Sequence, residues 1–531
     1  MKRLIIYPFL LIIAVNLDRA VISAIQIDLS LSLRSLFILL VLIGLIDFVI
    51  QYFVRDWHRT NFLVFVMLML VVAFGGGYRL IKSNFPAQSM PLAVLLIIAL
   101  CVLYPVITSK QLWYAIREPA QVSRFLNLVF AILLLMKIWD FANGAVKLTI
   151  QHSEVKATAI SPLTTDINLK SGTRPDIYVI ILDGYGRKDV LKDIYGYDNS
   201  QFLGELEKRG FYVATKNHSN YVQTTYALAS LLNFDYVEPW LPSSDYYQYL
   251  AKPIQQNRVY QSLKRIGYTT VSFEGISTYT EIRSSDIYLS AFLPLNKFES
   301  QFLVDSPLEV FSNYVNLDLP IPSYRTQRQR ILYSFDELQH LPVSMEQPRI
   351  VFAHILAPHP PFIFDENGNN IPQQSPYRLW DADFLSNQPD EYWGGYRQQV
   401  AFVNNRILKS IDGILENSKT PPIIVLMGDH GPASMFHWDL DAPGCIWERT
   451  SNLYALRLPG HQNDGTLYPS ISPVNTFRVI FDTYFGTDLP LLDDRTYLAS
   501  AKYPTIIKDV TEVIETHAGC AAPDRGIGET H

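Results

Sequence analysis

Five long apolar runs in the first 150 residues constrain the fold of this chain more than any other feature. Each run approaches the ~20 residues that an α-helix needs to cross the hydrocarbon core of a bilayer. The runs cover Leu4–Ala24, Leu36–Val54, Phe62–Tyr78, Leu92–Thr108 and Phe125–Val146. A cleaved signal peptide is the rival reading of the first run, but VNLDRA lacks the small-x-small pattern of a cleavage site. We therefore predict an N-terminal α-helical transmembrane bundle with about five spans over residues 1–150.

The basic residues between these runs predict which side of the membrane each loop faces. With the N-terminus inside, the inner segments hold most of the cations, which is the bias that cytoplasmic loops show. The inner group is Lys2, Arg3, Arg55, Arg59, Lys110, Arg117 and Arg124. The outer group is Arg34, Arg79, Lys82 and Lys147, with Arg19 near the outer end of the first run. This topology places everything after Lys147 outside the cytoplasm.

Ionisable residues within an apolar span suggest a function unless a neighbouring charge pairs with them. Asp47, Lys137 and Asp140 lie in or near the predicted spans. Lys137 and Asp140 are three residues apart on one helix face, so we interpret them as a local ion pair.

The outer part of the chain contains two cysteines, Cys445 and Cys520, whereas Cys101 lies in a span. An oxidising compartment outside the cytoplasm permits a disulfide between the two. The alternative is a pair of free thiols, because a sequence does not give the distance that the bond requires.

Residues 151–531 differ in composition from the membrane part. They carry 31 Lys and Arg against 44 Asp and Glu, whereas residues 1–150 carry 13 against 6. The chain has no basic block, which argues against a nucleic-acid partner. Residues 151–174 are polar without periodicity, so we predict a linker there and an extracytoplasmic domain at 175–531.

Short apolar runs bounded by turn residues alternate with helix-like stretches in this outer domain. Such runs are typical of strands buried on both faces of a sheet. The predicted strands lie in Ile177–Leu182, Tyr268–Gly275, Pro348–His359 and Pro421–Gly431, and the predicted helices in Asn199–Gly210 and Tyr396–Ser418. The alternation predicts an α/β fold with a mostly parallel central sheet.

Acidic and histidine side chains follow three of the predicted strands. Asp183, His359, Asp429 and His430 each come just after an apolar run. Ligands of open α/β sheets bind beyond the carboxyl ends of the strands, so we expect these residues at one edge of the sheet. Taken singly, an Asp-Gly turn or an isolated histidine is more often structural. Carboxylates and imidazoles that converge on one edge favour a divalent metal, Zn or Mn.

Two threonines, Thr224 and Thr225, precede the helix-like stretch YALASLLN. Hydroxyls at a helix start are usually N-caps, and we expect that role for at least one of them. The other hydroxyl would lie at a helix N-terminus, where backbone N–H groups favour an anion. A neighbouring metal would lower the pKa of that hydroxyl and make it a nucleophile.

The segments ILDGYGR, NYVQTTYALASLLN, HILAPHPPF and MGDHG, in this order after the N-terminal spans, resemble the alkaline phosphatase/sulfatase superfamily. The chain is more closely similar to its membrane-anchored transferase branch, which contains lipoteichoic acid synthases and lipid A phosphoethanolamine transferases. The resemblance implies an alkaline-phosphatase-like domain with one divalent metal, Mn or Zn, held by Asp183, Thr224, Asp429 and His430. It leaves a second metal open. It also implies that Thr224 is the nucleophile and that His359 acts in the substrate site.

The sequence departs from that branch at two positions. Asp183 stands where the two transferase groups have Glu, so a carboxylate is kept. Ala227 stands where a Ser usually follows the nucleophile, and Thr225 stays an alternative as nucleophile or substrate contact. No C/S-x-P-x-R motif surrounds Thr224, so we do not expect sulfate-ester hydrolysis through a formylglycine.

The resemblance implies a metal-dependent phosphotransferase in a bacterial inner (plasma) membrane, with the catalytic domain on the periplasmic or extracellular side. The expected donor is a membrane lipid, whose phosphoryl-linked head group passes through a phospho-threonine to an envelope glycan or glycolipid. One alternative is a phosphodiesterase, phosphatase or sulfatase-like hydrolase with the same site. Another is a catalytically inactive surface protein of the same fold.

Four further residues near the motifs have two interpretations each. Arg449, which follows Glu448, would contact an anionic substrate, or form a structural ion pair, which is the commoner fate of such a dipeptide. His218, His437 and Asp439 would join a second metal site, or lie in the substrate pocket or on the surface, which is commoner for such residues.

Overall fold

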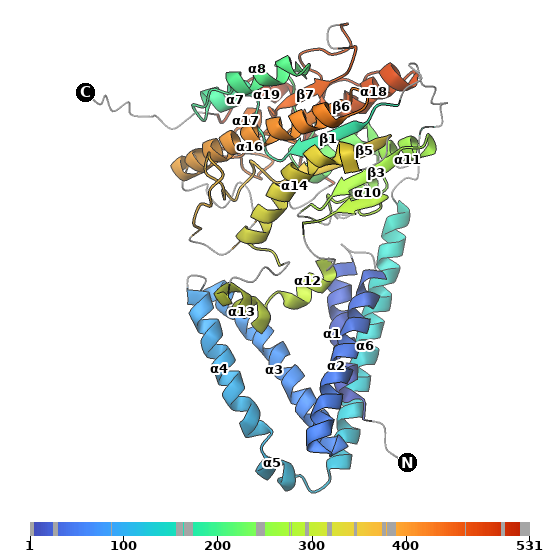
Figure 1. Ribbon diagram of the computed structural model, residues 1–531, viewed down its shortest axis with the longest axis vertical. Helices are drawn as coiled ribbons and strands as arrows, with labels where there is room; N and C mark the ends of the chain where they lie inside the picture. The colour runs from blue at the N-terminus through green and yellow to red at the C-terminus, as the bar shows by residue number, and fades with distance from the viewer. Residues whose placement is uncertain are drawn as a thin grey trace, which may run out of the picture. The chain divides into compact units, whose positions relative to one another are not determined.

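The structure is a computed structural model in which the chain forms two compact units (Figure 1). Unit 1 comprises Met1–His152, Phe292–Thr326 and Gln374–Tyr377, and unit 2 comprises Ser153–Ala291, Gln327–Gln373 and Arg378–His531. The residues that the structure describes are 5–24, 30–85, 88–154, 163, 174–240, 250–275, 277, 279–291, 297–315, 321–344, 348–373, 377, 379, 389–461, 464–500 and 505–520. The predicted linker at 151–174 lies mostly outside the described residues.

Unit 1 contains the N-terminal helices α1 (Tyr7–Ala24), α2 (Ser30–Val54), α3 (Trp57–Asn84), α4 (Ser89–Ile107), α5 (Lys110–Ala115) and α6 (Pro119–Glu154). Among the described residues, four stretches are long and apolar enough to cross a membrane: Ser32–Val54, Trp57–Asn84, Ser89–Ile107 and Pro119–Asn143. They correspond to the last four predicted spans. The helix α1 overlaps the first predicted span, Leu4–Ala24, but is not one of these four stretches. The helix α3 begins five residues before its apolar run, because the Asp56 carboxylate accepts hydrogen bonds from the N–H groups of His58 and Arg59.

Lys137 in α6 contacts two carboxylates rather than one. Its Nζ lies 2.5 Å from Oδ1 of Asp18 in α1 and 3.9 Å from Oδ2 of Asp140. The predicted pair with Asp140 is therefore the longer of the two contacts. Packing of the helices supplies the closer partner from a distant part of the sequence.

A segment from the middle of the chain also belongs to unit 1. It forms α12 (Lys297–Leu303), which contacts α2, and α13 (Pro307–Val315), which contacts α3 and α4 (Figure 1). The sequence predicts residues 175–531 as one extracytoplasmic domain, whereas the structure assigns 292–326 and 374–377 to the unit that holds the apolar helices. The segment belongs to unit 1 because of its contacts with helices far away in the sequence, and local composition does not reveal such contacts.

Unit 2 contains a seven-stranded sheet with the strand order β2-β7-β6-β1-β5-β3-β4. The strands are β1 (Ile177–Leu182), β2 (Tyr212–Val213), β3 (Thr269–Phe273), β4 (Ile287–Leu289), β5 (Arg349–Ile355), β6 (Ile423–Met427) and β7 (Tyr454–Arg457). The five strands from β6 to β4 run parallel, and β7 and β2 pair antiparallel at one edge. The predicted α/β class with a mostly parallel sheet is confirmed. The strands β8 (Tyr497–Ala499) and β9 (Ile507–Asp509) form a separate small sheet.

Helices cover both faces of the seven-stranded sheet. On one face, α9 (Thr224–Asn233), α11 (Arg258–Arg265) and α18 (Thr476–Phe485) pack against alternate residues of β1, such as Val179 and Ile181. On the other face lie α14 (Tyr324–Ser344) and α16 (Pro389–Asn417), which contact each other through Phe335 and Phe402 (Figure 1). The remaining helices are α7 (Lys188–Asp193), α8 (Ser200–Lys208), η3 (Glu238–Trp240), α10 (Ala251–Gln255), α17 (Ile446–Thr450), η5 (Pro473–Asn475) and α19 (Thr511–Ile514).

Candidate functional site

The site lies at the carboxyl ends of β1 and β6. These two strands pair in parallel, so their ends reach the same edge of the sheet. Asp183 follows β1 and Asp429 follows β6, and the N–H of Gly184 donates to Oδ1 of Asp429 over 3.1 Å. The two chain segments approach closely, because a Cβ added at Gly428 would lie 2.6 Å from the carbonyl oxygen of Tyr185. Glycine is therefore required there.

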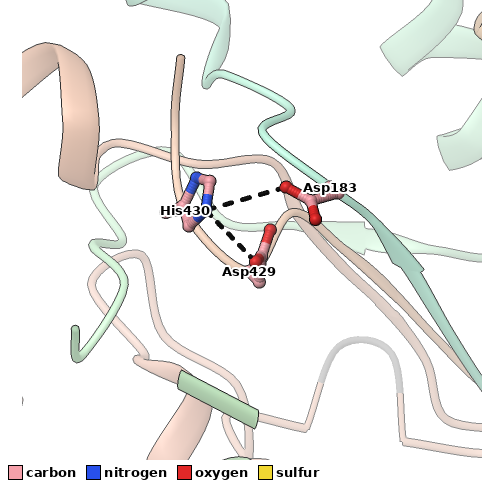
Figure 2. A group of neighbouring side chains, drawn as sticks. All are labelled: Asp183, Asp429 and His430. Atoms are coloured by element: carbon pink, nitrogen blue, oxygen red, sulfur yellow. Dashed lines mark ion pairs between the residues drawn. The ribbon is translucent and has the colours of Figure 1, made fainter. Parts of the chain in front are cut away.

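Asp183, Asp429 and His430 converge in this buried place (Figure 2). Nε2 of His430 lies 3.6 Å from Oδ1 of Asp183 and 3.3 Å from Oδ2 of Asp429. These two carboxylate oxygens are buried and accept no hydrogen bond from any described residue. A buried carboxylate oxygen without a donor is costly unless a cation compensates its charge. The donor set therefore fits a divalent metal, which would be held by two carboxylates and one imidazole.

The orientation of His430 suits a metal ligand. Its Nδ1 lies 2.9 Å from the carbonyl oxygen of Gly431, which can only accept, so Nδ1 carries the hydrogen. In the neutral ring, Nε2 then presents its lone pair toward Asp183 and Asp429. In metal sites, the ring nitrogen of a ligating histidine that does not bind the metal usually donates a hydrogen bond, which sets the tautomer of the ring.

Thr224 joins the same cluster from the first turn of α9. Its Oγ1 lies 3.1 Å from Nε2 of His430. The expectation that a threonine caps this helix is wrong, because Gln223 is the N-cap residue and makes no side-chain capping bond. The hydroxyl of Thr224 points instead to His430. Thr225 is half-buried, and among the described residues its side chain makes no hydrogen bond to the cluster.

His354 is a member of the site that the sequence reasoning missed. It lies near the end of β5, opposite Ile181 of β1, and its Nε2 is 3.0 Å from Oδ2 of Asp183. Burial opposes ionisation of Asp183, yet the nearby His359, His354 and His430 hold the pKa of its carboxyl well below the usual range. The signal in the sequence is a histidine inside the otherwise apolar run IVFAHI.

His359 lies beside the cluster, as the sequence predicts. Its backbone N–H donates to the carbonyl oxygen of Asp183 over 2.9 Å, which ties the turn after β5 to the turn after β1. Its Nδ1 lies 2.5 Å from the carbonyl oxygen of Pro360 and must be the donor there. The rings of His359 and His430 have centroids 6.5 Å apart. A substrate group between them would therefore meet both imidazoles.

Arg449 reaches the cluster from α17. Its Nη2 lies 3.1 Å from Nε2 of His430, and its Nε donates to the carbonyl oxygen of Val222 over 2.9 Å. Glu448 is turned away and accepts hydrogen bonds from Tyr195, Ser434 and the N–H of Met435. Successive residues of a helix point in different directions, which separates the two charges.

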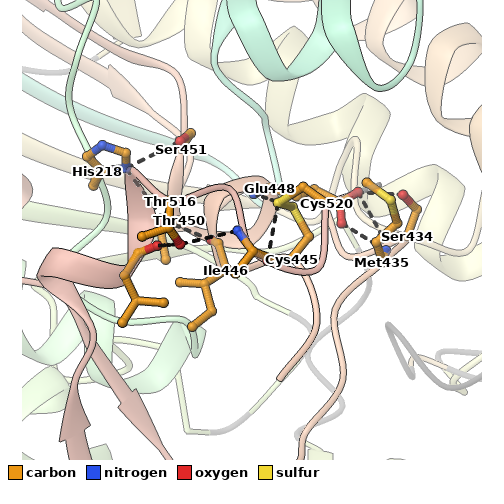
Figure 3. The surroundings of a disulfide bond; sticks show 12 residues. His218, Ser434, Met435, Cys445, Ile446, Glu448, Thr450, Ser451, Thr516 and Cys520 are labelled. Atoms are coloured by element: carbon orange, nitrogen blue, oxygen red, sulfur yellow. Dashed lines mark hydrogen bonds between the residues drawn. A yellow bond between two sulfur atoms is a disulfide. The ribbon is translucent and has the colours of Figure 1, made fainter. Parts of the chain in front are cut away.

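A disulfide fastens the helix that carries Arg449 (Figure 3). Cys445 and Cys520 are joined, with their Cα atoms 4.5 Å apart. Cys445 is also the N-cap of α17, and its Sγ accepts from the N–H of Glu448 over 3.3 Å. The bond thus links α17 to the chain that follows α19.

The three residues considered for a second metal lie outside the cluster. The one group of metal-ligating side chains found among the described residues is Asp183, Asp429 and His430. His437 and Asp439 are exposed. His218 is partly buried, with Nδ1 3.3 Å from Oγ of Ser451. The pKa of His218 is lowered to about 3. The main cause is burial of the ring, and the second is the nearby charge of Arg187.

No protein-family model matches the chain, and no curated protein does. Among solved structures, the chain is similar to the C-terminal periplasmic domain of EcEptC from Escherichia coli in complex with Zn, with 13% identity, a TM-score of 0.43, and coverage of 66% of this chain and 96% of that one. It is similar to the integral membrane lipooligosaccharide phosphoethanolamine transferase A (EptA) from Neisseria meningitidis, with 13% identity, a TM-score of 0.40, and coverage of 83% and 89%. It is also similar to BT1596, a 2-O GAG sulfatase, with 13% identity, a TM-score of 0.38, and coverage of 62% and 78%.

Proposed function

We propose that this protein is a metal-dependent transferase that moves a phosphoryl-linked group, such as a phospholipid head group, to a hydroxyl of a cell-envelope glycan or glycolipid. The observation that carries the proposal is the position of the Thr224 hydroxyl, 3.1 Å from Nε2 of His430 at the N-terminus of α9. A hydroxyl next to buried metal-type ligands and a helix N-terminus is suited to attack an anionic phosphodiester.

Asp183, Asp429, His430 and Thr224 would hold one divalent metal, Mn or Zn. When bound, such a metal lowers the pKa of a coordinated hydroxyl and stabilises charge that develops on phosphoryl oxygens. Buried carboxylates with oxygens that lack donors support this assignment.

In the first step, the oxygen of Thr224 forms a bond to the phosphorus of the donor, and the bond from phosphorus to the leaving oxygen breaks. The hydroxyl proton of Thr224 goes to solvent. His359 in its protonated form gives a proton to the leaving oxygen, which departs as the alcohol of a diacylglycerol when the donor is a phospholipid. The product on the protein is a phospho-threonine ester that keeps the head group.

In the second step, a hydroxyl of the acceptor attacks the same phosphorus. Its proton passes to His359, which recovers its starting charge. The bond from phosphorus to Thr224 breaks, and the threonine oxygen takes a proton from solvent. Arg449 is positioned to contact phosphoryl oxygens, since its guanidinium already lies against His430. Thr225 is a further candidate for substrate contact.

The test is to incubate the full-length, detergent-purified protein with candidate phospholipids and to measure the mass of the peptide that contains Thr224. We expect an added head-group phosphate on that residue, which disappears when an acceptor glycolipid is supplied. Thr224→Ala should abolish both the adduct and turnover, whereas the matched Thr225→Ala should retain them. An adduct on Thr225, or full activity in Thr224→Ala, would contradict the proposal. Release of the head group into water without an acceptor would instead indicate the hydrolase alternative.

A further inference from the structure

The helix α13 exposes a face of large hydrophobic side chains. Every residue of α13 that the structure describes as exposed is apolar: Leu308, Phe311, Tyr314 and Val315 have exposed fractions of 55%, 57%, 59% and 51%. Their spacing of three to four residues places them together on one side of the helix. In water, a face of large apolar side chains is unfavourable, and such faces mark sites of interaction.

The opposite face of α13 is fixed to the transmembrane helices. Val310 is 1% exposed and packs in a cluster with Phe74 and Tyr78 of α3 and Ala93 of α4. The helices α3 and α4 therefore already occupy one side of α13. The exposed face points away from this contact and needs a different partner.

The surrounding charges locate this segment at the outer end of the bundle. Cations predicted to lie outside the membrane pair with it: Arg34 with Glu299 at 2.5 Å, Arg79 with Asp305 at 4.0 Å and Lys82 with Asp305 at 3.0 Å. Arg19 adds a cation–π contact, with its guanidinium 4.5 Å from the ring centre of Phe302. The level of these charges corresponds to the head-group region, so the neighbouring apolar face lies where acyl chains begin.

An apolar cavity continues from α13 between α3 and α4. Its volume is about 290 Å³, and its lining includes Leu70, Phe74, Ile97, Leu100 and Tyr104 together with Pro307, the first residue of α13. The neighbouring outer surfaces of α3 and α4 are apolar and exposed, as at Val71 and Ile98. The cavity thus opens among these apolar surfaces, and Pro307 places the start of α13 at its edge.

We propose that α13 is an interfacial helix whose exposed face lies among the acyl chains of the outer leaflet, and that the adjoining cavity holds an acyl chain of a phospholipid. A lipid is favoured as occupant because α13 packs on α3 and α4, two helices long and apolar enough to span a membrane, whose exposed surfaces would contact lipid. The inference does not depend on the chemistry of Thr224, and its test needs no activity.

The first test uses spin labels in the full-length protein, reconstituted in phosphatidylcholine/phosphatidylglycerol vesicles. In a Cys101→Ser background, labels are placed by Phe311→Cys and Tyr314→Cys, and by Lys208→Cys as the water-exposed control. We expect oxygen to collide with the labels at 311 and 314 more often than a water-soluble nickel chelate, and the reverse at 208. Chelate access at 311 equal to that at 208 would overturn the proposal. Exclusion of both reagents would also overturn it, because a protein partner would then cover the face.

The second test addresses the cavity. Leu100→Trp fills it, whereas Leu103→Trp adds the same bulk on an exposed position of the same helix, 42% exposed. Phosphate that co-purifies with the protein in mild detergent should fall in Leu100→Trp and stay at the wild-type level in Leu103→Trp. Unchanged phosphate in both variants would overturn the assignment of the cavity to an acyl chain. Thermal melting of each variant checks that the fold is kept.

Discussion

The ammonium nitrogen of Lys82 lies 2.7 Å from a carboxylate oxygen of Glu309, although the two residues are 227 positions apart in the sequence. Lys82 belongs to the last turn of α3, and Glu309 to the first turn of α13. The side chains are 30% and 13% exposed, so the pair is partly withdrawn from water. This contact joins a segment of the outer part of the sequence to a helix that is long and apolar enough to cross a membrane.

We expect this pair to stabilise unit 1. Lys82→Met and Glu309→Gln should each lower the melting temperature of the detergent-solubilised protein. The double mutant should lose less stability than the sum of the losses in the two single mutants. The expected coupling is about 1–2 kcal/mol, because a charged hydrogen bond that is partly shielded from water keeps more of its strength than an exposed one. The exposed pair of Lys208 and Glu205 is the control, for which coupling of about 0.5 kcal/mol or less is expected. Equal coupling in both pairs would contradict the prediction.

Removal of one carboxylate should empty the proposed metal site. Asp429→Asn keeps the shape of the side chain but loses the charge, so bound metal measured by elemental analysis should drop sharply. Chelation of the wild-type protein should abolish activity, and Mn or Zn should restore it. Asp439→Asn, in an exposed residue outside the cluster, is the control and should retain metal. Wild-type metal content in Asp429→Asn would refute the assignment.

His354 should influence the metal through Asp183. Its Nε2 is 3.0 Å from Oδ2 of that carboxylate, so His354→Leu removes a partner that orients a ligand. We expect metal affinity to fall about 10–100-fold, as for other residues that hold ligands in place. His354→Gln can still donate a hydrogen bond from a similar position, so this variant should lose less metal affinity. A loss of stability with unchanged metal affinity would show a purely structural role.

The disulfide should stabilise unit 2. Cys520→Ser opens a link between residues 75 apart, for which a loss of about 2–4 kcal/mol is expected. Because Cys445 begins the helix that carries Arg449, catalytic turnover should also fall. Cys101→Ser, in a free cysteine of α4, should leave the melting temperature unchanged. Identical melting of the Cys520→Ser variant and the wild type would argue against the bond.

His218 should make stability depend on pH. Burial lowers its pKa to about 3 in the folded protein, whereas an unfolded histidine has a pKa of about 6.5. The unfolded state therefore binds the extra proton between these values, and stability falls as pH drops below about 6.5. His218→Gln should lose less stability than the wild type when the pH is lowered from 7 to 5, measured by thermal melting. An unchanged acid dependence would contradict the prediction.

Local features were predictable from the sequence where one physical cause dominates. β1 covers the predicted Ile177–Leu182, because an apolar run meets an Asp-Gly turn at which Gly184 has φ +71°. The edge of the sheet brings Asp183, Asp429 and His430 together because parallel strands end on the same side. The periodicity of apolar residues and the residue types of the turns are sufficient to predict these elements.

Features that depend on contacts between distant residues were not predictable in the same way. Helix-start statistics favoured a threonine cap, but the packing of α9 turns Thr224 toward His430 and leaves Gln223 at the cap position. The partner of Lys137 in α1 and the docking of α13 also arise from tertiary packing. A single sequence has no pattern that pairs Lys82 with Glu309.

Residues 297–315 belong to unit 1, and this has a consequence for release of the outer part by proteolysis. In a protein anchored only by its N-terminal helices, one cut in the predicted linker at 151–174 would release the whole outer part. Here the fragment after such a cut would still contain α12 and α13, with their ion pairs to α2 and α3. We therefore expect the nicked protein to stay with the membrane, and release of unit 2 to require separate cuts on both sides of this segment.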